Sequence, residues 1–176
     1  MKNILLGLSF IALSLSVFSQ TLSSDTMHWK ENHKLEWKDF SGKPLAQAGI
    51  TGQATMVMNA QFHKTLRAKA EVETIFDRKT SWVAKEDQTE QELRYYQVMF
   101  NLYEVASRKL RKQFKETRFG LDPDKIFQEK YRDASTALDE RCKLYMDETD
   151  MGADAAELER WAKTLQLELK ELETYK

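Results

Sequence analysis

The sequence predicts an α+β domain in which a small antiparallel sheet precedes three helices. Two observations carry this prediction. Between residues 49 and 76, apolar and polar residues alternate, as they do in strands with one face on a core. From residue 90 onward, apolar residues instead recur every three or four positions, as on helices packed against a core. The change of period divides a single domain into a sheet half and a helical half.

Two alternating stretches, residues 49–60 and 66–76, are expected to form neighbouring antiparallel strands. The alternation slips at residues 75–76, where a strand end or a bulge is expected. Residues 77–79 then predict a turn, and residues 80–83 a last short strand.

The chain before the sheet carries weaker signals. Residues 21–26 are polar and predict a loose leader. The first ordered feature is expected at residues 33–37, which alternate, and Gly42 and Pro44 mark a turn after them.

The first helix is expected to be the buried centre of the fold. Residues 93–104 carry apolar side chains most of the way round a helix, which is typical of a buried helix. Thr89 and Glu92 have the spacing of a capping box. The helix should therefore run from about residue 90 to 116 and end near Gly120.

Two further helices are expected. Asp122 and Pro123 fit an N-cap followed by proline at the first helical position. The acidic residues 146–152 are expected to form a loop or a frayed turn after the second helix. The third helix is indicated by apolar residues spaced three or four apart: Leu158, Trp161, Ala162, Leu165, Leu169 and Leu172.

The N-terminus is typical of a secretory signal. Lys2 precedes an apolar run over residues 4–18, and Ser19 is small enough for a cleavage site. A buried N-terminal helix is the alternative. The signal interpretation predicts a periplasmic or secreted protein, cleaved near Ser19, with residues 20–176 forming one domain.

Charge and cysteine content limit the possible functions. Without Lys2 the chain has 26 basic and 28 acidic residues, a net charge of −2. This balance does not indicate nucleic-acid binding, which requires a basic face. No segment after the signal is apolar enough to span a membrane. The only cysteine, Cys142, lies on an apolar helical face and is expected to be buried rather than a reactive thiol.

Four segments, in this order, resemble a family of secreted bacterial domains that are otherwise of unknown function. Residues 35–44 (LEWKDFSGKP) resemble the opening L-x-W-x-D-F-x-G-x-P of that family, and residues 81–83 its Ser-Trp-Val. Residues 93–110 resemble its L-x-H-E-Q-x-H-F-D-I-x-E-x-x-A-R-K-L helix, and residues 145–152 its Y-D-x-x-T-x-H-G. The resemblance implies a zinc-dependent protease fold of the zincin type, with the HExxH helix buried.

This sequence departs from the family at the positions that carry the chemistry. Tyr95 and Met99 replace the two histidines, Tyr96 replaces the glutamate, and Met151 replaces the histidine before the glycine. Catalytic zinc takes three nitrogen, sulfur or carboxylate ligands and an open position for water. Methionine is a soft ligand that suits copper(I) better, and tyrosine binds well only after losing a proton of pKa near 10. All three histidines of the chain precede this helix.

Two hypotheses follow. The first is an exported, non-catalytic, pseudoprotease-like domain with a binding or structural role, no cofactor, and an unknown protein or envelope component as partner. The second is a metallopeptidase that holds zinc at a non-standard site, with Glu104 and the acidic loop contributing. Under the first hypothesis the former metal pocket is either plain core or a binding groove. Its candidate residues are Tyr95, Tyr96, Met99, Met151 and Glu104.

Polar residues near this pocket are interpreted as structural. Glu104 and Arg108 stand four apart in the favourable order for a helical ion pair. The acidic residues around position 150 could bind calcium, but they lack the spacing of a calcium loop, so a solvated loop is expected.

Overall fold

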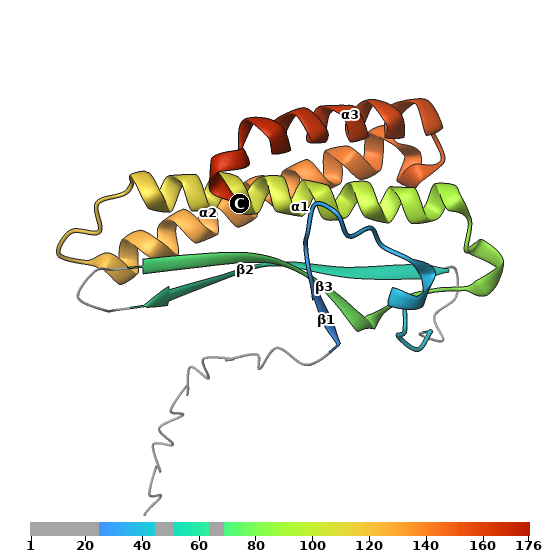
Figure 1. Ribbon diagram of the computed structural model, residues 1–176, viewed down its shortest axis with the longest axis horizontal. Helices are drawn as coiled ribbons and strands as arrows, with labels where there is room; N and C mark the ends of the chain where they lie inside the picture. Colours follow the sequence, from blue (N-terminus) through green and yellow to red (C-terminus); the bar gives the residue numbers. More distant parts are fainter. Residues whose placement is uncertain (1–24, 45–50, 64–68) are drawn as a thin grey trace, which may run out of the picture.

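The computed structural model describes residues 25–44, 51–63 and 69–176 of the chain. The predicted signal peptide lies outside these residues. The predicted α+β class is confirmed, because a small antiparallel sheet precedes three helices (Figure 1). The elements are β1 (Thr26–His28), η1 (Trp37–Asp39), β2 (Gly52–His63), β3 (Lys69–Val83), η2 (Lys85–Asp87), α1 (Glu90–Glu116), α2 (Pro123–Glu148), η3 (Asp150–Gly152), α3 (Ala155–Glu171) and η4 (Glu173–Tyr175).

The three described strands follow the order β1-β3-β2, so β3 is the central strand. Strands β2 and β3 form the predicted hairpin pair, with Met58 opposite Thr74. The first ordered feature was predicted too late in the chain. Strand β1 is formed by Thr26–His28 and overlaps the predicted loose leader only at Thr26, and residues 33–36 form no strand. Strand β1 forms because its backbone pairs with Ile75–Asp77 of β3, a partner about fifty residues away.

Strand β3 carries a wide irregularity just after the point where the alternation slips. Gln53 lies opposite Trp82, and Thr55 lies opposite Asp77, so two steps along β2 match five along β3. The Asp77 carboxylate accepts hydrogen bonds from the backbone N–H groups of Lys79 (2.9 Å) and Thr80 (3.2 Å). The irregularity lies between Asp77 and Trp82, later than predicted, because Ile75 and Phe76 pair in regular register with Val57 and Met56. The predicted turn and separate last strand are wrong, because β3 continues to Val83.

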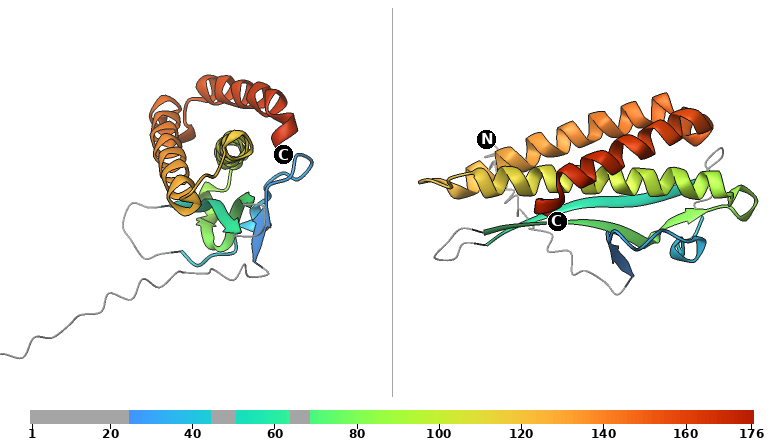
Figure 2. Two further views of the ribbon diagram at one scale, coloured as in Figure 1. Left: turned by 90° about the vertical axis from the view of Figure 1, so that its left-hand side faces the viewer. Right: turned by 45° about the horizontal axis from the view of Figure 1, so that its top comes forward.

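Helix α1 is the centre of the fold. The end-on view in Figure 2 shows the sheet on one side of it, with α2 and α3 on the other sides. This arrangement explains why the helix is apolar most of the way round, since each face meets a different layer. Phe76 of the sheet, Phe100 and Leu102 of α1, and Leu165 of α3 are all almost completely buried in one core.

The helix starts follow the sequence signals closely. Thr89 caps α1 by accepting a hydrogen bond from the backbone N–H of Glu92 (3.1 Å), and Asp122 caps α2. The capping box at Thr89 is incomplete, because its backbone N–H donates to Asp87 instead. Helix α1 ends at Glu116, as predicted, but its cap is the extended residue Thr117 and not Gly120.

The end of α2 differs from the prediction. Residues 146–148 are helical, and only Asp150–Gly152 form a separate turn. Acidic residues at a helix C-terminus interact unfavourably with the helix dipole, so this acidic stretch is more typical of a loop. The Glu148 carboxylate is instead bound by Arg160 and by the Trp161 indole N–H (2.8 Å) of α3, and these contacts offset the unfavourable charge.

The helices also bear on Cys142 and on membrane spans. Cys142 is buried, as predicted. Within the described ranges, no helix has both the length and the apolarity needed to cross a membrane.

Candidate functional site

The two tyrosines at the start of the α1 pattern are part of an aromatic cluster. Tyr95 stacks on Tyr145 of α2 with ring centroids 5.1 Å apart, and its ring also meets Tyr96 edge-on at 5.3 Å. Tyr96 packs against Phe40 at 5.3 Å. The Tyr145 hydroxyl donates to the backbone carbonyl of Tyr95 (2.9 Å). Both Tyr95 and Tyr96 are buried, so they contribute to the packing of the core.

Burial has an electrostatic consequence for these hydroxyls. Removal from water disfavours the phenolate, which raises the pKa of Tyr95 to about 12. Burial also raises the pKa of Tyr96, and a hydrogen bond to Glu92 adds to this effect. Both side chains therefore remain neutral at physiological pH, which makes them poor metal ligands.

The turn after α2 comes back against this cluster. A Cβ atom placed on Gly152 would lie 2.9 Å from the Cβ, Cγ and Cδ2 atoms of Tyr95, so the glycine backbone touches the ring. Gly152 has φ of +95°, and Met151 before it has φ of +51°. The Met151 side chain points away from this contact, with 72% of its surface exposed.

The remaining position, Met99, is half-buried and packs against the core. The residues implied by the resemblance thus do not fit a zinc ion. Tyr95 offers a stacked neutral phenol, Met99 a thioether, and Met151 an exposed side chain. Among the residues that the structure describes, no three His, Cys, Asp or Glu side chains are grouped so that they could hold a metal ion.

Glu104 belongs to a buried polar network and not to the aromatic cluster. Its carboxylate accepts hydrogen bonds from Thr74 Oγ1 (2.7 Å), Arg108 Nε (2.9 Å) and Arg111 Nη1 (2.9 Å). The Thr74 hydroxyl also lies 2.7 Å from Ser107 Oγ. The predicted ion pair between Glu104 and Arg108 is therefore present, and it is deeply buried.

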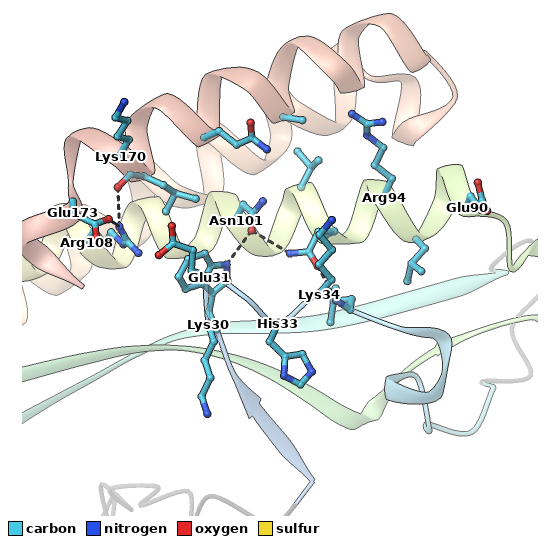
Figure 3. Close-up of a pocket in the computed structure, with 18 residues that line it drawn as sticks. Lys30, Glu31, His33, Lys34, Glu90, Arg94, Asn101, Arg108, Lys170 and Glu173 are labelled. Atoms are coloured by element: carbon cyan, nitrogen blue, oxygen red, sulfur yellow. Dashed lines mark hydrogen bonds and ion pairs between the residues drawn. The ribbon is translucent and has the colours of Figure 1, made fainter.

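A separate cleft of about 1000 Å³ lies on another face of α1. One wall is the segment 29–35, which follows β1, and the other wall is α3 with η4 (Figure 3). Leu93, Val98 and Leu169 supply apolar surface. None of the five residues that the sequence singled out lines this cleft.

Hydrogen bonds fix the segment 29–35 to α1. The Trp29 indole N–H donates to Asn101 Oδ1 (2.9 Å), and the backbone N–H of Leu35 donates to Gln97 Oε1 (2.7 Å). Gln97 Nε2 also donates to Asn101 Oδ1 (3.1 Å), which links the two contacts. Arg108 lies over the Trp29 ring, 5.1 Å from its centroid, and donates to the Leu169 carbonyl (2.7 Å). The cleft therefore has a defined wall, held at both ends.

The charged lining of the cleft has a positive balance. The basic members are Lys30, Lys34, Arg94, Arg108 and Lys170, and the acidic members are Glu31, Glu90 and Glu173. The net charge of the lining is +2 with His33 neutral, although the whole chain has a net charge of −1. The cleft is thus a locally basic part of a slightly acidic protein.

Sequence reasoning missed this cleft because its walls come from three distant parts of the chain. The available signal was the pair of amides, Gln97 and Asn101, in the most apolar stretch of the helix, residues 93–104. Buried polar side chains are usually hydrogen-bonded, so these two amides predict a segment packed against this face of the helix.

The comparisons with known proteins add no relative to this description. The chain matches no family model, no curated protein and no solved structure.

Proposed function

We propose that this protein is an exported, non-catalytic domain that binds a ligand from a protein or envelope partner in the cleft between residues 29–35 and α3. The observation that carries the proposal is the cleft itself. Hydrogen bonds fix its wall, and Lys34 and Lys170 of its lining form no ion pair with a described residue. A concave surface with a few oriented polar groups is the usual form of a binding site.

The resemblance to the zincin-like family supports the non-catalytic part of this proposal. Under it, the chain is a degenerate member in which large aromatic side chains replaced the metal ligands and restored close packing. Two contacts agree with this replacement: Tyr95 stacks on Tyr145, and the Gly152 backbone packs against Tyr95. The former pocket then stabilises the fold, and the binding role belongs to the opposite face of α1.

The alternative is a zinc-dependent peptidase with a non-standard metal site. Its candidate groups have other partners in the structure. Glu104 is held by Thr74 and two arginines, and Glu148 by Arg160 and Trp161. Asp154 caps α3 through the backbone N–H groups of Ala156 and Glu157. No observation favours this alternative.

Metal analysis of the purified mature protein separates the two functions. Our proposal predicts less than stoichiometric zinc, no peptidase activity on casein, and a Tm unchanged by EDTA, since a bound metal normally adds stability. Stoichiometric zinc, lost together with peptidase activity on chelation, would refute it. N-terminal sequencing of the secreted form should begin near Gln20.

Site-specific cross-linking tests the cleft. A photoreactive phenylalanine analogue at Gln166, which lines the cleft, should capture a partner in the cells that export the protein. The same analogue at Lys143, an exposed α2 residue outside the cleft lining, is the matched control. Equal capture from both positions would place the interaction elsewhere.

A further inference from the structure

The cleft is long. Its lining on α1 extends from Glu90 to Arg108, which corresponds to about 27 Å at the helical rise of 1.5 Å per residue. An extended chain advances about 3.3 Å per residue, so about eight residues would span this length. The length fits a single extended peptide.

The lining also has an excess of hydrogen-bond donors. An indole N–H can only donate, so the Asn101 atom that meets Trp29 must be the oxygen. This oxygen also accepts from Gln97 Nε2, and the amide is therefore held in one orientation. The Asn101 NH₂ group bonds to no described residue and is not among the buried unpaired atoms, so it faces the open cleft. It is positioned to donate to a carbonyl or a carboxylate.

The free charges of the cleft are mainly positive. Arg94 is paired with Glu159, and Arg108 with Glu104. The acidic residues Glu31 and Glu173 are both paired with Lys176. The remaining charges form no ion pair with a described residue: Lys30, Lys34 and Lys170 are basic, and Glu90 is acidic.

The close-up separates these free cations by position. Lys30 and His33 point away from α3, whereas Lys34 lies on the cleft side of the segment (Figure 3). Lys170 stands at the α3 edge of the cleft, and its amino end points away from α1. Lys34 therefore places a positive charge inside the cleft and Lys170 places one at its edge, and neither forms an ion pair with a described residue.

We infer that the ligand is an extended, acidic peptide segment of about eight residues. Its carboxylates would meet Lys34 and Lys170, and the Asn101 amide would donate to one of its oxygens. Small apolar side chains of the peptide would face Leu93 and Leu169. This inference rests on the proposed function and specifies its ligand.

Fluorescence anisotropy with defined peptides tests the inference. The probe is an eight-residue peptide that alternates glutamate and valine and carries fluorescein, compared with its glutamine and lysine counterparts. The glutamate peptide should bind at least about tenfold more tightly than either, and its affinity should fall with added salt. Equal affinity for all three peptides would overturn the acidic assignment, as would tighter binding of the lysine peptide.

Two substitutions place the binding in the cleft. Asn101→Asp keeps both hydrogen bonds that the side-chain oxygen accepts but replaces the free donor with a negative charge. This variant should lower the affinity for the glutamate peptide about tenfold or more. Lys34→Glu should do the same, whereas Lys143→Glu, an identical charge change outside the cleft lining, should leave affinity within about twofold. Circular dichroism melting confirms that each variant is folded. Equal loss in Lys143→Glu, or none in Asn101→Asp, contradicts a cleft site.

The outcomes distinguish this inference from the broader proposal. If no peptide binds but Gln166 still cross-links a partner, the extended acidic ligand is wrong and cleft binding stands. If neither peptide binding nor cross-linking is found, both are wrong. An eight-nucleotide DNA strand serves as a polyanion control, and its binding as tightly as the glutamate peptide would also overturn the peptide assignment.

Discussion

Replacing Glu104 with glutamine should destabilise the protein strongly. The Glu104 side chain is 3% exposed, and Arg108 beside it is 1% exposed. Glu104→Gln keeps the shape of the side chain but removes the charge that balances Arg108. Among the described residues, the other carboxylate paired with Arg108 is the exposed Glu173, whose oxygen lies 3.8 Å from Nη1. A buried guanidinium without its partner costs about 3–5 kcal/mol.

The measurement is urea unfolding followed by circular dichroism. A loss of about 3–5 kcal/mol should also lower Tm by roughly 6–20 °C for a domain of this size. Glu159→Gln is the matched control, because it makes the same chemical change in the exposed pair with Arg94 and should cost at most about 1 kcal/mol. The double variant Glu104→Leu with Arg108→Met should recover part of the loss, since no buried charge remains on this pair. A Glu104→Gln protein within about 1 kcal/mol of the wild type would refute the reasoning.

Three further predictions concern the aromatic cluster and its neighbours. Gly152→Ala should lower the free energy of unfolding by about 1–3 kcal/mol, because its φ is +95° and the new Cβ would meet Tyr95. In the double variant with Tyr95→Ala, the two losses should not add, because the residues are in contact. Thermal melts of the single and double variants test this. Burial raises the pKa of Cys142 to about 11 and of Tyr95 to about 12, so the folded state favours their protonated forms. Their stabilising effect is complete below about pH 8 and should decline by about 2–3 kcal/mol by pH 10.5, whereas unfolding free energies equal at pH 8 and 10.5 would contradict it. Finally, Cys142 should react with Ellman's reagent at pH 8 only after urea is added, and rapid labelling of the folded protein would show that the thiol is exposed.

The sequence predicted the parts of the fold that local interactions determine. The start of α1 follows from Thr89, whose hydroxyl caps a backbone N–H three residues away. The start of α2 follows from Asp122 and Pro123 for the same reason. The burial of Cys142 follows from its place on an apolar helical face.

The parts that the sequence did not predict depend on distant partners. Strand β1 is three residues long and has no local signal, because it forms through pairing with β3. The cleft depends on the contact between Trp29 and Asn101, which are 72 residues apart. The exposure of Met151 results from positive φ values at Asp150 and Met151, which a residue pattern does not show.

The order of the strands has a consequence for folding and for local opening. Strands β2 and β3 are neighbours in the chain and can pair as soon as both exist, whereas β1 is made first and has no partner until β3 follows. The segment 29–35 is therefore attached late, by a three-residue strand and a few side-chain hydrogen bonds. Amide hydrogens of β1 should exchange with deuterium well before those of the β2–β3 hairpin. One wall of the cleft would then open by local unfolding while the rest of the domain stays intact, and a peptide could enter from the side.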